Sequence, residues 1–235
     1  MDRYVDKVRT KAFKGRMKQD SWPYEMHVIH PKSAGRHLRT FVFLHGFKME
    51  ASEMLSVFSI ISESLPTWRF VLPQAPETAI TAHEGEETIS WYNYLSDTGG
   101  ESEDTVDIFS LRSVRMALQK LVSAETALLP DKKGLVLGGL SQGGTMALHM
   151  ATFVQCQACV TAVACRLSNS VYRSLKCPWH ALVASRDDVF PWTWSQKLMK
   201  GSASVQVVDD THYLECTEVG DFFLEILRGL EKEEA

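Results

Sequence analysis

Short apolar runs alternate with amphipathic stretches along most of the chain. Seven runs rich in β-branched and aromatic residues predict strands at residues 24–30, 39–44, 68–73, 134–138, 158–164, 179–184 and 204–208. Apolar residues spaced three or four positions apart predict helices at 52–65, 108–122, 143–154, 192–199 and 219–230. Strands that are apolar throughout and alternate with helices predict an α/β fold, a mostly parallel sheet with helices on both faces.

Two parts of the chain depart from this alternation. About six residues, KSAGRH, separate the first two apolar runs, which predicts an antiparallel hairpin at the N-terminal edge of the sheet. The alternation of apolar runs and amphipathic stretches is lost between Pro76 and Leu111, where the sequence is acidic and contains glycines, with aromatic residues at its centre. A loop of this length in a compact domain is usually functional or disordered.

One stretch without charged residues, Gln142–Cys165, is long enough to span a bilayer. His149, Gln155 and Gln157 interrupt it, and its end becomes β-branched. We therefore interpret it as a buried helix followed by a buried strand, and expect no stable membrane span.

Composition adds limits on the class of protein. The chain has 235 residues, of which 45% are hydrophobic, and a formal net charge of −4, so it can bury the core of one domain and offers no basic surface for nucleic acid. We interpret residues 1–20 as a solvated basic arm and residues 21–235 as a single domain. The alternative is that this arm makes a transient contact with an acidic membrane surface.

The cysteines bear on location and on metal binding. There are five, and the N-terminus has no apolar signal core, so we expect free thiols in the cytoplasm. Cys156 and Cys159 form a single C-x-x-C pair. Zinc prefers four ligands, so we expect two packed thiols there, and neither a metal nor another cofactor.

The stretch GGLSQGGT places Ser141 between glycines, after a predicted strand and before a predicted helix. Glycines let such a turn close and let a substrate approach a nucleophile on it. A serine hydroxyl needs a base and an orienting carboxylate to become reactive. Ser141 is therefore the candidate nucleophile.

The chain order serine, acid, histidine selects the partners of this serine. His212, after a late strand and before the last helix, is the candidate base. Four carboxylates precede it in suitable places: Asp187, Asp188, Asp209 and Asp210. The first two follow a strand that ends at the same sheet edge as the serine, and we rank Asp187 before Asp188.

An acyl-transfer site also needs two fixed donors for the oxyanion. Gln142 supplies the first, because its backbone N–H follows the nucleophile at a helix N-terminus. Phe47 supplies the second, because the strand FVFL breaks at His45 and Gly46. The alternative for His45 and Gly46 is a simple turn that ends the strand.

These residues resemble a known family. LHGF, PQAP, SWYNY, GGLSQGG, Asp187 followed by VFP after one Asp, and His212 occur in the order found in acyl-protein thioesterases and related small carboxylesterases. The resemblance covers about residues 40–230 and implies an α/β-hydrolase fold. It also implies a triad of Ser141, Asp187 and His212, with Asp187 preferred because it stands four residues before Pro191 as the family's acid does.

The resemblance implies acyl thioesters on protein cysteines, or lipid and small carboxylic esters, as substrates. After LHG this chain reads FKMEASEM where the family has a Gly-Asp pair, so the acyl-chain preference does not follow from the resemblance. We expect an apolar groove for the acyl chain, and its candidate residues are Phe47, Met54, Leu55, Trp91 and Trp192. The alternatives are a carboxylesterase or lysophospholipase acting on small esters or lipids, and an inactive hydrolase-fold binding module.

Overall fold

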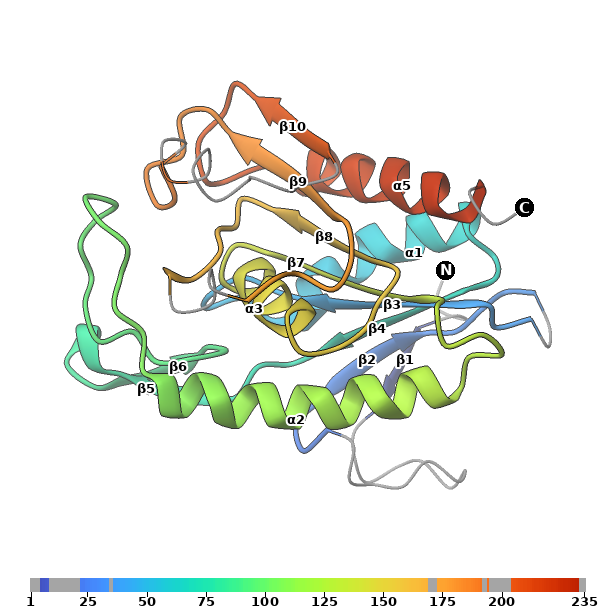
Figure 1. Ribbon diagram of the computed structural model, residues 1–235, viewed down its shortest axis with the longest axis horizontal. Coiled ribbons are helices and arrows are strands. Elements are labelled where there is room, and N and C mark those ends of the chain that lie inside the picture. The colour runs from blue at the N-terminus through green and yellow to red at the C-terminus, as the bar shows by residue number, and fades with distance from the viewer. Residues whose placement is uncertain are drawn as a thin grey trace.

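An eight-stranded, mostly parallel sheet forms the centre of the computed structural model, which describes residues 5–8, 22–33, 36–168, 173–191, 194 and 204–232. The sheet order is β1-β2-β4-β3-β7-β8-β9-β10 (Figure 1). Its strands are β1 (Val5–Val8), β2 (Met26–Ile29), β3 (Arg39–Leu44), β4 (Trp68–Pro73), β7 (Leu135–Leu140), β8 (Ala158–Ala162), β9 (Trp179–Ala184) and β10 (Ser204–Val208). All seven predicted strands are present.

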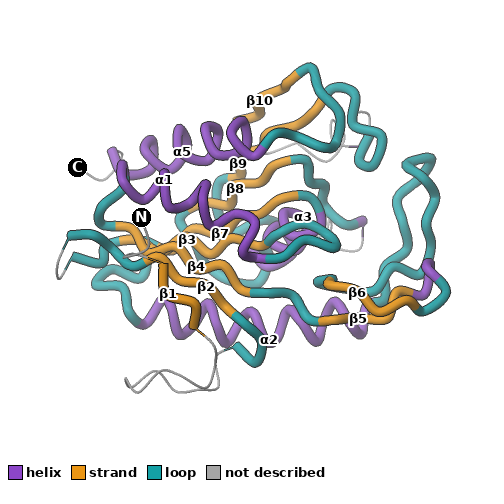
Figure 2. The backbone as a smooth tube through the Cα atoms, turned by 180° about the vertical axis from the view of Figure 1, so that it is seen from behind, coloured by secondary structure: helices purple, strands orange, loops and turns teal. Residues whose placement is uncertain are grey.

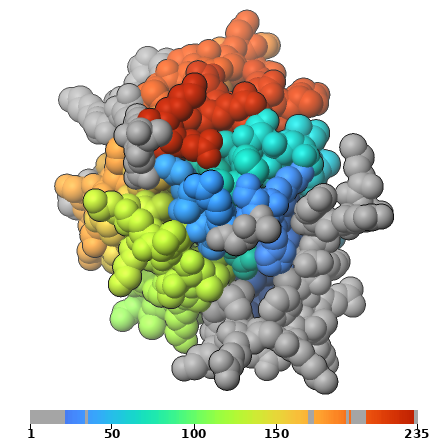
Figure 3. Space-filling view, turned by 90° about the vertical axis from the view of Figure 1, so that its right-hand side faces the viewer, coloured from blue at the N-terminus to red at the C-terminus, as the bar shows by residue number. Residues whose placement is uncertain are grey.

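Helices cover both faces of this sheet (Figures 1 and 2). On one face lie α1 (Leu55–Ser64), preceded by the 3₁₀ turn Ala51–Met54, and α5 (Cys216–Lys232); on the other lie α2 (Ile108–Ala127) and α3 (Gln142–Ala151). Figure 3 views the end of the molecule opposite the carboxyl ends of the parallel strands, with the red C-terminal residues and the cyan residues around α1 above the blue N-terminal residues and the yellow-green residues around the end of α2 below. Four of the five predicted helices are confirmed, and the prediction for 192–199 lies almost wholly outside the described residues.

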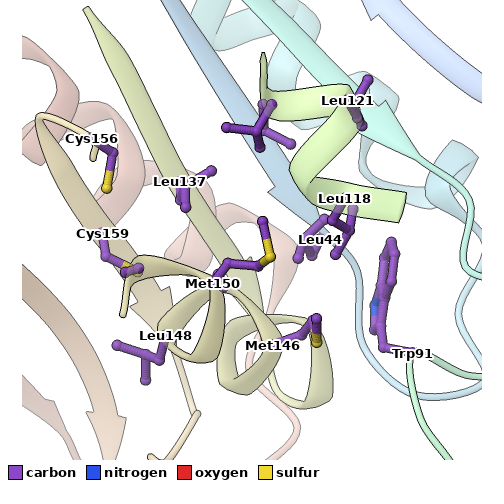
Figure 4. Close-up of a cluster of buried hydrophobic side chains, with 14 of the residues drawn as sticks. Leu44, Trp91, Leu118, Leu121, Leu137, Met146, Leu148, Met150, Cys156 and Cys159 are labelled. Carbon is purple, nitrogen blue, oxygen red and sulfur yellow. The ribbon is translucent and has the colours of Figure 1, made fainter. Parts of the chain in front are cut away.

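The core has two layers because the strands alternate. Phe41 and Phe43 of β3 face the cluster formed with α1 and α5, whereas Val42 and Leu44 face the cluster formed with α2 and α3. Figure 4 shows the second cluster, in which leucines and methionines of α2 and α3 pack against the sheet. A strand that is apolar on both faces is stable only between two such layers, which explains why β3 lies inside the sheet.

The N-terminal edge is antiparallel as predicted, but its pairing differs from the expected hairpin. β2 pairs with β4 on one side and with β1 on the other, and β3 lies between β4 and β7, parallel to both. The short connection therefore skips over one strand position. β1 also shows that Val5–Val8, within the predicted solvated arm, joins the sheet edge.

The long segment after β4 is more regular than expected. It contains the hairpin of β5 (Glu77–Ile80) and β6 (Glu86–Ile89), with a 3₁₀ turn at Thr81–His83, and an isolated bridge between Tyr94 and Val106. Glu84 and Gly85 both have a positive φ, which closes the hairpin. The segment therefore contains defined local structure and is not one long irregular loop.

The charge-free stretch forms the helix and strand that the sequence predicted. α3 and β8 occupy most of it, and every residue of both is buried. Within the part of the chain that is described, no helix combines the length and apolar character needed to cross a membrane.

Candidate active site

Ser141 sits on a strained turn between β7 and α3. Its φ and ψ are 51° and −122°, a backbone conformation that non-glycine residues rarely adopt. Its N–H donates to the carbonyl of Ala162 at 2.9 Å, and its own carbonyl accepts from Thr145 at 2.9 Å. The neighbouring strand and the first helical turn therefore hold the strained residue in place, as expected where strain serves function.

Close backbone contact explains why glycines surround this serine. A Cβ on Gly143 would lie 2.1 Å from the carbonyl oxygen of Leu44 and 2.2 Å from that of His45. A Cβ on Gly139 would lie 2.5 Å from the same Leu44 oxygen. The glycines therefore let the turn after β7 pack directly against the end of β3.

The serine, the histidine and one aspartate form a continuous hydrogen-bonded relay. The hydroxyl of Ser141 lies 2.7 Å from Nε2 of His212. Nδ1 of the same imidazole lies 3.0 Å from each carboxylate oxygen of Asp187. A proton on Nδ1 donates to the carboxylate and leaves Nε2 to accept from the serine, which is the arrangement that a general base requires.

Asp187 is buried and preorganised. It is 7% exposed, and its Oδ1 also accepts from the backbone N–H groups of Val189 and Phe190 at 2.9 and 2.7 Å. Its neighbour Asp188 is exposed, and Asp209 forms an ion pair with Arg186 at 3.0 Å. The structure therefore brings Asp187, of the four candidates, to the histidine.

Two aromatic rings border the imidazole of His212. The Phe190 ring lies 5.4 Å and the Tyr213 ring 5.6 Å from it, both edge-on, and Tyr213 is 79% exposed. The sequence analysis assigned no role to either residue, although Phe190 lies in the VFP stretch and Tyr213 directly follows His212.

The His45–Phe47 segment lies beside the serine. A Cβ on Gly46 would be 3.7 Å from the Cβ of Ser141. Within the described ranges, the N–H groups of Phe47 and Gln142 donate to no protein acceptor. Gln142 is fully buried, and Phe47 is half-buried.

His45 fixes the peptide that carries the Phe47 N–H, a role that the sequence analysis missed. Nδ1 of His45 donates to the Gly46 carbonyl at 2.8 Å, and Nε2 accepts from the Ala75 N–H at 3.0 Å. Burial lowers the pKa of His45 to about 4, so the ring is neutral near pH 7. Because the Gly46 carbonyl and the Phe47 N–H belong to one peptide unit, this hydrogen bond sets the direction of that N–H.

The side chain of Gln142 ties the turn to the SWYNY stretch. Its Oε1 accepts from the Trp91 N–H at 2.9 Å, and its Nε2 donates to the Ser90 hydroxyl at 2.8 Å. The indole N–H of Trp91 in turn donates to the His45 carbonyl at 2.7 Å. These bonds connect the segment of His45 and Phe47 to the segment that begins at Gln142.

The structure corrects two of the predicted groove residues. Trp91 and Met54 are both 0% exposed, so neither lines an open groove. Figure 4 shows Trp91 beside Leu44 and Leu118 in the core. Met54 belongs to the opposite cluster, because the turn at 51–54 directs it inward.

The structure describes two of the other three groove candidates. Leu55 is half-buried and packs against the core under α1. The Phe47 ring is half-buried and lies 5.5 Å from the Tyr94 ring. Trp192 lies outside the described residues. No group of three or more potential metal ligands occurs within the part of the chain that the structure covers.

Comparisons with known proteins identify the family of the chain. A family model described as phospholipase/carboxylesterase matches residues 25–210. Among curated proteins, the chain is 32% identical over 134 residues to acyl-protein thioesterase 1 of Mycosarcoma maydis, covering 52% of this chain and 54% of that protein. It is 30% identical over 122 residues to the Schizosaccharomyces pombe protein of the same name, with 52% of each chain covered. The chain thus matches about half the length of these curated relatives.

Solved structures show the same fold. Acyl-protein thioesterase 2 of Zea mays matches with a TM-score of 0.68 and 18% identity, over 88% of this chain and 99% of that chain. SOBER1 of Arabidopsis thaliana matches with a TM-score of 0.69 and 15% identity, over 83% and 99%. At these identities the likeness establishes the fold alone, and it is the α/β-hydrolase fold that the sequence predicted.

Proposed function

Because the chain belongs to the phospholipase/carboxylesterase family, we propose that it is a serine hydrolase that cleaves acyl thioesters on protein cysteines through an acyl-enzyme. One observation carries the proposal: Ser141, His212 and Asp187 form a single relay with contacts of 2.7 and 3.0 Å. These three residues follow three different strands of the sheet. A purely structural role would not require a strained serine at the point where they meet.

In the first step, the Ser141 hydroxyl attacks the acyl carbonyl while Nε2 of His212 accepts its proton. The carboxylate of Asp187 holds the imidazole in the required tautomer and stabilises the imidazolium. His212 then donates the proton to the leaving thiol. In the second step, a water molecule attacks the acyl-serine with His212 again as base, and the acid and free Ser141 are released.

The oxyanion that forms in each step needs donors that are already in place. We assign this role to the backbone N–H groups of Phe47 and Gln142. The position of Gly46, where an added Cβ would lie 3.7 Å from the Ser141 Cβ, and the hydrogen bond from His45 to the Gly46 carbonyl support the first assignment. The position of Gln142 at the start of α3, where the helix dipole favours negative charge, supports the second.

A thioester is the substrate class that we favour. The curated relatives are named acyl-protein thioesterases, and a thiol with a pKa near 8.5 leaves more readily than an alcohol. The five cysteines, all of them free thiols in the structure, support a reducing, cytoplasmic location. For the acyl chain we retain Leu55, Phe47 and Trp192 as groove candidates.

Hydrolysis of lysophospholipids or small carboxylic esters is the second candidate function. The family description, which names both phospholipase and carboxylesterase, favours it, and the same relay would perform it. An inactive binding module is the third, and the intact relay argues against it.

A side-by-side assay separates these functions. A palmitoylated peptide thioester and a short-chain oxyester are hydrolysed in parallel, with Ser141→Ala as control. Thioester activity that greatly exceeds oxyester activity, and that is lost in the variant, is the expected result. Preference for the short oxyester supports the second candidate, and activity on neither supports the binding module.

A further inference from the structure

Three cysteines gather at the end of the molecule away from the relay. Cys156 follows α3, Cys159 lies on β8, and Cys177 precedes β9. Figure 4 shows the first two at the edge of the core cluster. The sulfur of Cys156 lies 3.1 Å from that of Cys177, so the C-x-x-C cysteine at 156 has its closest thiol contact with a cysteine outside that motif.

The backbones that carry these two sulfurs are held together by several hydrogen bonds. The Lys176 N–H donates to the Ala151 carbonyl at 3.1 Å, and its ammonium donates to the Phe153 carbonyl at 3.0 Å. The Gln155 side chain donates to the Lys176 carbonyl at 3.1 Å. The two thiols therefore meet within a fixed frame, and the sulfurs need to approach by only about 1 Å to reach a disulfide bond length near 2.05 Å.

The two thiols differ in access and in chemical role. Cys177 is half-buried, whereas Cys156 is 4% exposed. The Cys156 thiol donates to the Cys177 sulfur, and this hydrogen bond together with burial raises the pKa of Cys156. Cys177 is thus the sulfur that a reagent reaches first, with Cys156 behind it as a protonated partner.

We propose that Cys156 and Cys177 are a reversible redox pair that forms an intramolecular disulfide with a low-molecular-weight disulfide such as glutathione disulfide as oxidant. Cys177 attacks one sulfur of the oxidant, and one glutathione thiol leaves with the proton that Cys177 gives up. Cys156 then loses its proton and, as the thiolate, attacks the Cys177 sulfur of the mixed disulfide; the second glutathione leaves from that sulfur and takes up a proton. Two protein thiols are oxidised and one glutathione disulfide is reduced to two thiols.

The position of the pair determines what the bond would do. It would join the C-terminal end of α3 to the start of β9, whereas Ser141 lies at the other end of α3 and Asp187 follows the other end of β9. Oxidation therefore stiffens the two elements that carry relay residues without entering the site. We expect it to raise thermal stability and to leave hydrolysis near its reduced value, so the inference does not rest on the proposed function.

The test uses the full chain with the exposed Cys216 replaced by serine, so that contacts between molecules do not interfere. The protein is equilibrated with glutathione disulfide and analysed by intact mass and peptide mapping. We expect the loss of two hydrogen atoms, a crosslinked peptide that joins Cys156 to Cys177, reversal by dithiothreitol, and an unfolding midpoint raised by roughly 5–10 °C.

Two variants in the same background sharpen the test. Cys177→Ser abolishes the crosslink, whereas Cys159→Ser retains it together with the gain in midpoint. A crosslink through Cys159, a stable glutathione adduct on Cys177 or an unchanged set of thiols would each overturn the proposal. Peptide mapping of the parent chain gives this answer even if a variant folds poorly.

Discussion

Nδ1 of His212 lies 3.0 Å from both carboxylate oxygens of Asp187, although a second aspartate follows immediately in the chain. The turn after β9 separates the two: Asp187 is buried and accepts backbone hydrogen bonds from Val189 and Phe190, whereas Asp188 is exposed. Asp187 and Asp188 are thus adjacent in sequence, but the turn brings the carboxylate of Asp187 to the imidazole.

This difference predicts unequal effects of two matched substitutions. Asp187→Asn keeps the shape but removes the charge that orients the imidazole, so kcat should fall by about 10³- to 10⁴-fold. Asp188→Asn should leave kcat near the parent value. Steady-state hydrolysis of an acyl thioester by both variants checks this, and equal losses would contradict the assignment of the acid.

The glycines around Ser141 predict a second contrast. Gly143→Ala places a Cβ about 2 Å from two carbonyl oxygens of the β3 end, so it should destabilise the fold by about 1–3 kcal/mol or more and lower activity. Gly229→Ala, in α5 with nothing within 4 Å of the new Cβ, should stabilise by roughly 0.5–1 kcal/mol. Urea unfolding measures both. An unaffected Gly143→Ala protein would show that the contact with β3 is not tight.

The strands and the relay were predictable from the sequence because each leaves a local signal. Residues 41–44 are apolar on both faces, as an internal strand must be, and Ser141, Asp187 and His212 each follow a strand in the order of a hydrolase. The acid alone stayed ambiguous until the resemblance was used, because spacing does not separate neighbouring aspartates.

What the sequence did not predict depends on contacts between distant segments. The short link between β2 and β3 is compatible with a hairpin and also with a connection that passes over β4. Only the packing of both faces of β3 selects the second arrangement. Trp91 looked like a loop aromatic, yet its N–H groups are taken by Gln142 and His45. The positioning role of His45 is hidden for the same reason, because its partners at Gly46 and Ala75 become visible only in three dimensions.

His45 should act on catalysis without touching the substrate. His45→Ala removes the hydrogen bond that orients the Gly46–Phe47 peptide, so kcat should fall by about 10²- to 10³-fold, as on loss of one oxyanion donor, with little change in KM. His180→Ala, a half-buried histidine at the start of β9 whose Nδ1 lies 2.8 Å from the Ser204 hydroxyl, serves as control. Steady-state kinetics and urea unfolding are measured together, and an unchanged kcat in a folded variant would remove the positioning role.

Two buried histidines predict acid sensitivity of the fold. Burial lowers the pKa of both His45 and His149 to about 4, and the nearby Arg115 and Arg173 contribute at His149. In the unfolded chain these groups titrate near 6.5, so the unfolded state takes up protons first as the pH falls. The free energy of unfolding should decrease between about pH 6.5 and pH 4, by up to about 3 kcal/mol per histidine, and these two groups add nothing further below that range.

Urea unfolding across this pH range measures the effect. His149→Gln should show a shallower pH dependence than the parent, whatever its stability near pH 7. A free energy of unfolding that stays constant from about pH 6.5 to pH 4 would mean that the two rings are not kept neutral by the fold.

The most direct test of the account is to trap the covalent intermediate. The protein is mixed with a long-chain acyl thioester, quenched in acid and analysed by intact mass and peptide mapping. We predict a mass increase of one acyl group, located on the peptide that carries Ser141. Ser141→Ala should carry no adduct. His212→Ala should not accumulate the acyl-enzyme either, because its serine is not activated. Turnover of the thioester with no acyl group on Ser141, or at the parent rate in Ser141→Ala, would contradict the central claim.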